Sequence, residues 1–219
     1  MSKSLFISRA LTAHDPLRTE LEAQGWEITA MSLIQIIPTE FELPKPLPDW
    51  VFFSSSNAVK TFYRQYPDVP FKIGVTGKGT EKTVKEYEQE ASFVGEGTDM
   101  NQVGKAFAEE VGDETVLFPV SSRSSKSIQN HIPESQQIVS TVYKTILRKG
   151  LQLPETDVVV LSSPSNAEAY LDDRKVPENA TVIAYGETTK SYLNEQGVTD
   201  VKVPDQPNSK SILEIVQRL

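Results

Sequence analysis

The stretch Asp49-Trp50-Val51-Phe52-Phe53-Ser54-Ser55-Ser56-Asn57-Ala58 recurs later in the chain as Asp157-Val158-Val159-Val160-Leu161-Ser162-Ser163-Pro164-Ser165-Asn166. From Ser54 to Ser162 the offset is 162 − 54 = 108 residues. A second pair, Gly77-Lys78-Gly79-Thr80 and Gly186-Glu187-Thr188-Thr189, has an offset of 189 − 80 = 109 residues. Each copy leads from a hydrophobic run through a hydroxyl-rich turn into a helical pattern. We therefore expect two equivalent lobes, with a ligand held between their turns.

Outward from these copies, predicted strands alternate with helical patterns along the whole chain. Extended segments are predicted at 5–8, 26–31, 33–37, 51–53, 72–75, 93–94, 115–118, 138–146, 158–161, 181–185 and 201–203, and short or amphipathic helices lie between most of them, including one over 124–131. Alternation of this kind is typical of parallel sheets covered by helices on both faces. The predicted fold class is α/β, with two doubly wound parallel-sheet lobes joined by a two-stranded ribbon.

The position of the first strand–helix–strand unit predicts a discontinuous lobe. That unit ends near residue 31, before the first repeat copy, so it must complete the C-terminal third of the chain. The predicted first lobe is therefore 1–33 plus 147–219, and the second lobe is 38–142. Residues 34–37 and 143–146 would cross between the lobes as an antiparallel ribbon and act as a hinge.

Composition excludes several kinds of site. The 219 residues include no cysteine and only two histidines, so we expect no disulfide, no thiolate site and no metal. A formal charge of −8 argues against nucleic acid or an anionic membrane as a partner. We find no apolar window of transmembrane length and no signal peptide, and we expect a cytoplasmic protein.

The hydroxyl-rich turns are the candidate binding elements. Ligands of doubly wound sheets bind beyond the carboxyl ends of the strands, where helix N-termini attract anions. The candidates at this position are Ser54, Ser55, Ser56, Asn57, Thr80, Ser163, Ser165, Asn166, Thr188 and Thr189. Any one of them could simply cap its helix. Four such turns at matched offsets favour anion binding, whereas the fingerprints of nucleotide-binding loops and of serine hydrolases are missing.

Several segments together resemble the uroporphyrinogen-III synthase family over nearly the whole chain. They are Ile7-Ser8-Arg9, the block from Val51 to Val59, Ile73 to Thr80, Val142-Tyr143-Lys144-Thr145, Leu161 to Ser165 and Ile183 to Thr189. The resemblance implies two α/β lobes, the first built from both chain ends, and no metal or organic cofactor. It also implies that the substrate is hydroxymethylbilane, a linear tetrapyrrole with eight carboxylates. Its hydroxyl would be expelled, its last ring inverted and the macrocycle closed as uroporphyrinogen III.

The resemblance also suggests individual roles. Tyr143 aligns with the tyrosine of the family's Val-Tyr-x-Thr segment and is the predicted acid for the departing hydroxyl. Arg9, Arg123 and Lys126 would add local positive charge, although solvation at the surface is the simpler interpretation of each. The chain departs from the family pattern at Ser54, where threonine is common, and at Asn166, where a small residue is frequent. The segment 118–123 also lacks a glycine often seen there.

The expected partner is hydroxymethylbilane, bound by a monomer that contacts hydroxymethylbilane synthase transiently. Two alternatives stay open at this point. One is a non-enzymatic bilobal protein that closes on a small anion. The other is an α/β transferase acting on a nucleotide sugar, which would need a carboxylate pair for a metal or a nucleotide loop.

Overall fold

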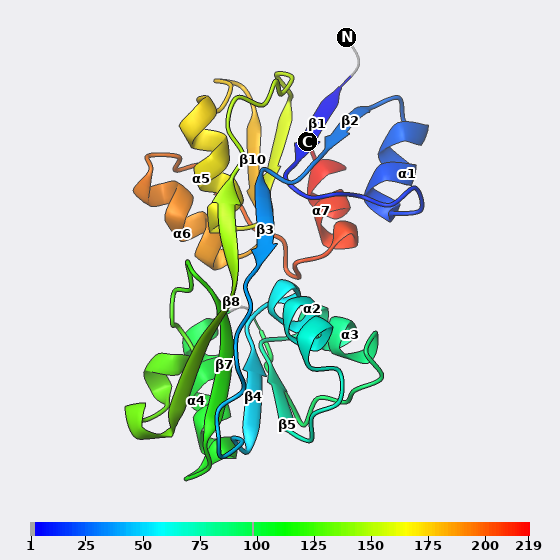
Figure 1. The fold of residues 1–219 in the computed structure, drawn as a ribbon. Helices are drawn as coiled ribbons and strands as arrows, with labels where there is room; N and C mark the ends of the chain where they lie inside the picture. Colours follow the sequence, from blue (N-terminus) through cyan, green and yellow to red (C-terminus); the bar gives the residue numbers. More distant parts are fainter. Residues whose placement is uncertain (1–2, 98) are drawn as a thin grey trace. The chain divides into compact units, whose positions relative to one another are not determined.

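Two separate sheets organise the chain, and the computed structural model describes residues 3–97 and 99–219 (Figure 1). Unit 1 comprises Met1–Gln35 and Ile146–Leu219, and unit 2 is the continuous segment Ile36–Thr145. Strands alternate with helices in both units. The predicted α/β fold class is confirmed.

Unit 1 contains a parallel sheet in the order β2-β1-β9-β10-β11 among the described residues. Its elements are β1 (Ser4–Ile7), α1 (Pro16–Ala23), β2 (Glu27–Ala30), β9 (Val158–Leu161), α5 (Pro164–Asp173), β10 (Thr181–Ala184), α6 (Glu187–Glu195), β11 (Val201–Lys202) and α7 (Ser209–Val216). In chain order the sheet runs 2-1-3-4-5, which is a doubly wound arrangement. The order reverses between β1 and β9, so the expected ligand position lies beyond the carboxyl ends of these two strands.

Unit 2 contains the sheet β6-β5-β4-β7-β8-β3. Its elements are β4 (Trp50–Phe53), α2 (Ser56–Gln65), β5 (Lys72–Val75), α3 (Lys78–Lys85), β6 (Phe93–Val94), α4 (Met100–Val111), β7 (Val116–Ser121), 3-10 turns at Gln129–His131 and Glu134–Gln136, and β8 (Gln137–Leu147), with β3 (Ile34–Pro38) on the edge. The strands from β6 to β8 pair in parallel. Here the order reverses between β4 and β7.

The two sheets share one topology, with the chain order permuted. Strands β9, β10 and β11 of unit 1 correspond to β4, β5 and β6 of unit 2, and these pairs carry the sequence repeat. Strands β1 and β2 correspond to β7 and β8, which follow their repeat copy instead of preceding it. The permutation explains why the sequence repeat covers only part of each unit.

Strands β3 and β8 run antiparallel to each other. The Thr39 N–H donates to the Val142 carbonyl at 2.8 Å, and the Arg148 N–H donates to the Leu33 carbonyl at 2.9 Å. Residue numbers therefore rise along one strand as they fall along the other. Each strand begins in one unit and ends in the other.

Alternate strand residues pack against helices on opposite faces of each sheet. In β1, Phe6 packs with the α5 residue Tyr170, whereas Leu5 and Ile7 pack with α1 and α7. In unit 2 the α2 residues Ala58, Val59, Phe62 and Tyr63 are buried, as their helical spacing predicts. Both faces are covered, which is why the central strands are hydrophobic throughout.

Close packing in unit 2 requires a glycine at position 74 of β5. A Cβ there would lie 2.6 Å from a ring carbon of Phe52 and 2.7 Å from one of Phe107. These two rings already pack with their centroids 4.3 Å apart. A larger residue would force the rings to move.

The predicted helix over 124–131 is wrong, because only Gln129–His131 forms a helical turn. Serine hydroxyls accept from local backbone amides in this segment: Arg123 N–H donates to Ser121 Oγ and Lys126 N–H to Ser124 Oγ. Such bonds compete with helix formation. Lys126 also has a left-handed φ of 57°, which a continuous α-helix does not allow.

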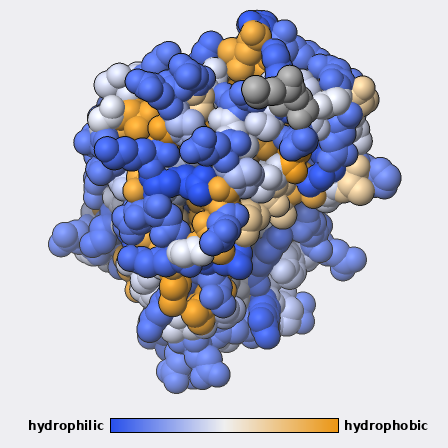
Figure 2. Space-filling view, turned by 90° about the horizontal axis from the view of Figure 1, so that it is seen from above, coloured by the Kyte–Doolittle hydropathy of each residue, from blue (hydrophilic) through white to orange (hydrophobic). Residues whose placement is uncertain are grey.

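The face in Figure 2 is largely hydrophilic, with hydrophobic residues in small separate groups. The large hydrophobic side chains that are exposed include Ile37, Leu47, Val139, Ile146 and Leu219. Isolated exposed residues of this kind are usual on protein surfaces. Among the described residues, none of the helices has the length and apolar character needed to cross a membrane.

Candidate functional site: hydroxyl groups at the carboxyl ends of the strands

In unit 2, Ser55 connects the end of β4 to the start of α2. It is the N-cap of α2, and its Oγ accepts from the Ala58 N–H at 3.2 Å. The same oxygen lies 3.0 Å from the Tyr143 hydroxyl. Since an N-cap satisfies only part of the first helical turn, other N–H groups of α2 remain directed toward this edge. Ser55 therefore places Tyr143 beside an anion-attracting helix end.

The β4–α2 turn is tied to the neighbouring β5–α3 turn. Thr83 Oγ1 donates to Ser56 Oγ at 2.8 Å, and Ser56 Oγ donates to the Gly79 carbonyl at 3.4 Å. Thr76 Oγ1 donates to the Ser54 carbonyl at 3.4 Å. These bonds hold the two turns as one hydroxyl-rich edge of the parallel strands.

Tyr143 is mostly buried, with 6% of its surface exposed. Burial raises the pKa of its phenol, and side-chain hydrogen bonds from Ser55 and Ser121 act in the opposite direction. The phenol is therefore protonated at neutral pH. In that state it can donate a proton or a hydrogen bond, as the sequence prediction requires.

In unit 1, the matching edge is formed by Ser8, Ser162 and Ser163. Ser8 Oγ accepts from the Ser162 N–H at 2.8 Å, and Ser162 Oγ donates to the Ser8 carbonyl at 2.9 Å. Ser163 is the N-cap of α5 and accepts from the Asn166 N–H at 3.3 Å. The carboxyl ends of β1 and β9, where the strand order reverses, are thus joined through serine hydroxyls.

Asn166 lies inside unit 1, with 4% of its surface exposed. Its Oδ1 accepts from the Leu33 N–H at 2.9 Å, and its Nδ2 donates to Ser163 Oγ at 3.0 Å. Both ends of the amide are engaged within the protein. This arrangement gives Asn166 a structural reason to depart from the small residue of the family pattern.

Arg9 follows β1, and its guanidinium is engaged by neighbours in unit 1. It donates to the Asp15 carboxylate at 3.2 Å and to Ser209 Oγ, and it lies over the ring of Tyr185 at 5.5 Å. Asp15 is also the N-cap of α1, and Ser209 begins α7. Arg9 therefore joins three elements, and Asp15 offsets much of the charge that the sequence prediction offered to a ligand.

The threonines of the second turns are less exposed than predicted. Helices α3 and α6 begin before them, with Gly77 and Gly186 as N-caps. Thr80 and Thr189 lie in the first helical turns and are 7% and 4% exposed. The other predicted residues are exposed (Ser54, Arg123, Thr188) or half-buried (Ser56, Asn57, Ser165).

Sequence reasoning overlooked Ser8, Asp15, Ser121, Tyr185 and Ser209. A signal was present for Ser8 and Ser121, because each stands at the carboxyl end of a strand beside the topological switch. Asp15, Tyr185 and Ser209 approach Arg9 only through tertiary folding.

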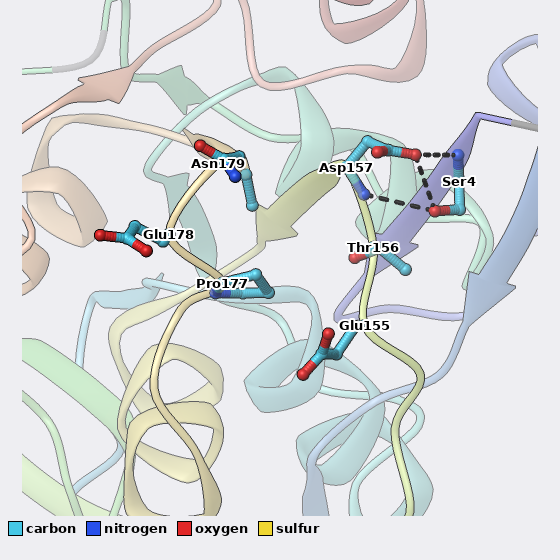
Figure 3. A pocket seen from close by; sticks show the side chains of 8 residues that line it. Ser4, Glu155, Thr156, Asp157, Pro177, Glu178 and Asn179 are labelled. Carbon is cyan, nitrogen blue, oxygen red and sulfur yellow. Dashed lines mark hydrogen bonds between the residues drawn. The ribbon is translucent and has the colours of Figure 1, made fainter. Parts of the chain in front are cut away.

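A polar hollow of about 310 Å³ lies at the opposite, amino edge of the unit 1 sheet (Figure 3). Its lining includes the carboxylates of Glu155, Asp157 and Glu178. Asp157 accepts from the Ser4 N–H at 2.7 Å and from Ser4 Oγ at 2.9 Å. An acidic lining repels carboxylate ligands, so this hollow is unsuited to the expected anion. Within residues 3–97 and 99–219, we find no cluster of three or more histidines, aspartates or glutamates arranged to hold a metal ion.

The fold and these strand ends define a two-unit α/β protein with hydroxyl groups and helix N-termini arranged for an anionic ligand. The family model of uroporphyrinogen-III synthase HemD matches residues 15–214. The chain therefore belongs to the uroporphyrinogen-III synthase family.

Solved structures support the same fold. The uroporphyrinogen-III synthetase of Helicobacter pylori is 20% identical, with a TM-score of 0.70 and coverage of 100% of this chain and 99% of that chain. A mutant uroporphyrinogen III synthase of the thermophilic bacterium Thermus thermophilus is 13% identical, with a TM-score of 0.62 and coverage of 99% and 98%. A search of curated proteins found no match.

Proposed function

We propose that this chain converts hydroxymethylbilane to uroporphyrinogen III, with inversion of the last pyrrole ring and loss of water. The observation that carries this function is the family match over residues 15–214. The chemistry of the strand ends agrees with it, because a substrate with eight carboxylates needs many hydrogen-bond donors.

The substrate carboxylates are proposed to bind at the serine-rich turns. In unit 2 these are the turn at Ser54, Ser55 and Ser56, and in unit 1 the turn at Ser163 and Ser165, each leading into a helix N-terminus. Backbone N–H groups and hydroxyls attract anions there without free lysines. An acidic protein of charge −8 can thereby bind an acidic substrate.

Tyr143 is the proposed proton donor. The Tyr143 phenol would give its proton to the departing hydroxyl, which leaves as water, and the resulting electrophilic carbon would bond to the inverted ring. Because the same intermediate closes spontaneously to the type I isomer in water, the enzyme's main contribution is to hold the chain in the geometry for inversion. Loss of the phenol hydroxyl should therefore reduce turnover but not abolish it.

An isomer assay tests both proposals. Purified protein receives freshly made hydroxymethylbilane, and the porphyrins are separated after oxidation. We expect type III in excess over type I, whereas type I alone at the spontaneous rate would reject the function and favour a binding protein. A Tyr143→Phe variant should form type III about 10²-fold more slowly. Undiminished turnover would remove Tyr143 from the proton-transfer step.

Three finer features extend the proposal. Paired strands β3 and β8 support residues 34–37 and 143–146 as a hinge between 1–33 plus 147–219 and 38–142. The lack of cysteine agrees with a cytoplasmic enzyme. The reactivity of the substrate favours a monomer that receives it during transient contact with hydroxymethylbilane synthase. Sedimentation, alone and with the synthase, tests the monomer and the contact.

A further inference from the structure

The pairing of β7 with β8 contains one irregularity beside Tyr143. Val120 lies opposite Thr141, but the next residue, Ser121, lies opposite Tyr143. Val142 is thus the extra residue of a β-bulge. Bulges are rare in parallel pairs and often redirect a side chain next to a functional site.

Burial along β8 shows the effect of this bulge. Before it, the exposed residues are Val139 and Thr141, two positions apart; after it, they are Lys144 and Ile146. Val142 and Tyr143 are consecutive and both buried. Side chains of a regular strand alternate between faces, so an uninterrupted β8 would place Tyr143 on the same face as Val139 and Thr141. The bulge turns Tyr143 inward.

Once Tyr143 faces inward, its hydroxyl has a serine partner on each neighbouring strand end. Ser55 Oγ lies 3.0 Å away, and Ser121 also forms a side-chain hydrogen bond with the phenol. Ser121 is itself held in place, because its Oγ accepts from the Arg123 N–H at 3.1 Å and lies 3.0 Å from Thr145 Oγ1. All of these residues belong to unit 2.

The two serines differ in what else they do. Ser55 caps α2, so its replacement would disturb the helix as well as the phenol. Ser121 ends β7 and caps no helix of the described chain. Its hydroxyl lies at a register position that exists only because of the bulge.

We propose that Ser121 is a positioning residue that, through the β7–β8 bulge, fixes the orientation of the Tyr143 hydroxyl for proton donation. The inference rests on the proposed function for its catalytic consequence, but the positioning itself can be measured without substrate. Hydrogen bonding from Ser121 stabilises the phenolate that remains after the proton leaves, and burial opposes that phenolate. Ser121 thereby makes proton donation easier.

The test combines spectroscopy and kinetics on the full chain. The protein is labelled with 3-fluorotyrosine, a more acidic phenol, and the Tyr143 signal is assigned by its loss in Tyr143→Phe. In Ser121→Ala we expect the fluorine signal to titrate at higher pH than in the parent protein. We also expect kcat for type III formation to fall about tenfold, with KM changed less than twofold. Ser121→Thr keeps the hydroxyl and should restore both. Ser140→Ala, on β8 before the bulge, is the matched control and should alter neither.

An unchanged Tyr143 titration in Ser121→Ala overturns the proposal, whatever the kinetics show. A loss of kcat that Ser121→Thr does not restore also overturns it, because it would indicate a role of side-chain size alone. If the parent protein forms no type III product, the proposed function fails, while the fluorine titration still decides whether Ser121 positions Tyr143.

Discussion

Replacing Asn166 with alanine should destabilise unit 1 without weakening substrate binding. The sequence pattern suggested a binding residue, whereas the structure places the side chain inside the protein between Leu33 and Ser163. Alanine would remove the side-chain oxygen that accepts from the buried Leu33 N–H. The substitution therefore separates a structural role from a binding role.

The expected loss follows from the two hydrogen bonds. A buried N–H left without a partner costs about 1–3 kcal/mol, and loss of the bond to Ser163 costs about 0.5–1.5 kcal/mol. Alanine recovers about 0.5 kcal/mol through its higher helix propensity within α5. We expect a net decrease of about 2 kcal/mol in the free energy of unfolding of unit 1.

The two tryptophans allow the units to be followed separately. Trp26 lies in unit 1 and Trp50 in unit 2. In a Trp50→Phe background, urea unfolding monitored by Trp26 fluorescence reports unit 1. With a slope of about 2 kcal/mol per molar urea, a loss of about 2 kcal/mol lowers the midpoint by about 1 M.

Two further variants sharpen this result. Asn166→Asp retains an oxygen for the Leu33 N–H and should lose less stability than Asn166→Ala. Asn57→Ala, near the start of α2, exchanges the same residue types at a half-buried position and should change stability by less than about 0.5 kcal/mol. An unchanged urea midpoint for Asn166→Ala together with a raised KM for hydroxymethylbilane would refute the structural assignment.

The remaining predictions concern packing and pH. Gly74→Ala should destabilise unit 2 by about 1–3 kcal/mol, because its Cβ would overlap two phenylalanine rings. Gly79→Ala, where a Cβ meets nothing within 4 Å, should be neutral or stabilising in the same urea experiment. The Tyr63 hydroxyl is buried without a recorded partner, and burial raises its pKa to about 12. The folded state therefore holds this proton more tightly than the unfolded state, and stability falls as pH rises above about 10, so Tyr63→Phe should flatten the alkaline loss of stability. The pKa values of Asp49 and Asp157 are lowered by hydrogen bonds from Thr115 and Ser4, respectively. The unfolded state then binds more protons, so their stabilisation is complete above about pH 4 and is lost on acidification; Asp49→Asn and Asp157→Asn should weaken acid sensitivity in unfolding followed from about pH 5 to 2.

Those two aspartates also illustrate the internal repeat. Asp49 precedes β4 and accepts from the N–H and hydroxyl of Thr115, at the start of β7. Asp157 precedes β9 and makes the same pair of bonds with Ser4, at the start of β1. Their spacing, 157 − 49, is again 108 residues. The repeat thus preserves an interaction at the amino edge of each sheet as well as the turns at the carboxyl edge.

Much of the candidate site was accessible from local sequence. Ser55 and Ser163 follow hydrophobic strands and precede helical patterns, and both are N-caps in the structure. Tyr143 was accessible only through the family resemblance, since an aromatic residue on an extended segment has no intrinsic signature of chemistry. The extent of β7 was underestimated: pairing with β4 is recorded only as far as Leu117, but pairing with β8 continues past Pro119 to Ser121.

The sequence by itself determined the α/β class, the permuted pairing of segments and the serine caps, because hydrophobic runs, helical spacing and capping residues act over a few neighbouring positions. Only the tertiary structure decided which polar groups are committed to the protein. Asp15 neutralises Arg9 from six residues away, Leu33 occupies the amide of Asn166 from 133 residues away, and a single extra residue in β8 turns Tyr143 toward Ser121. Such partners depend on strand register and helix packing, which no local pattern specifies.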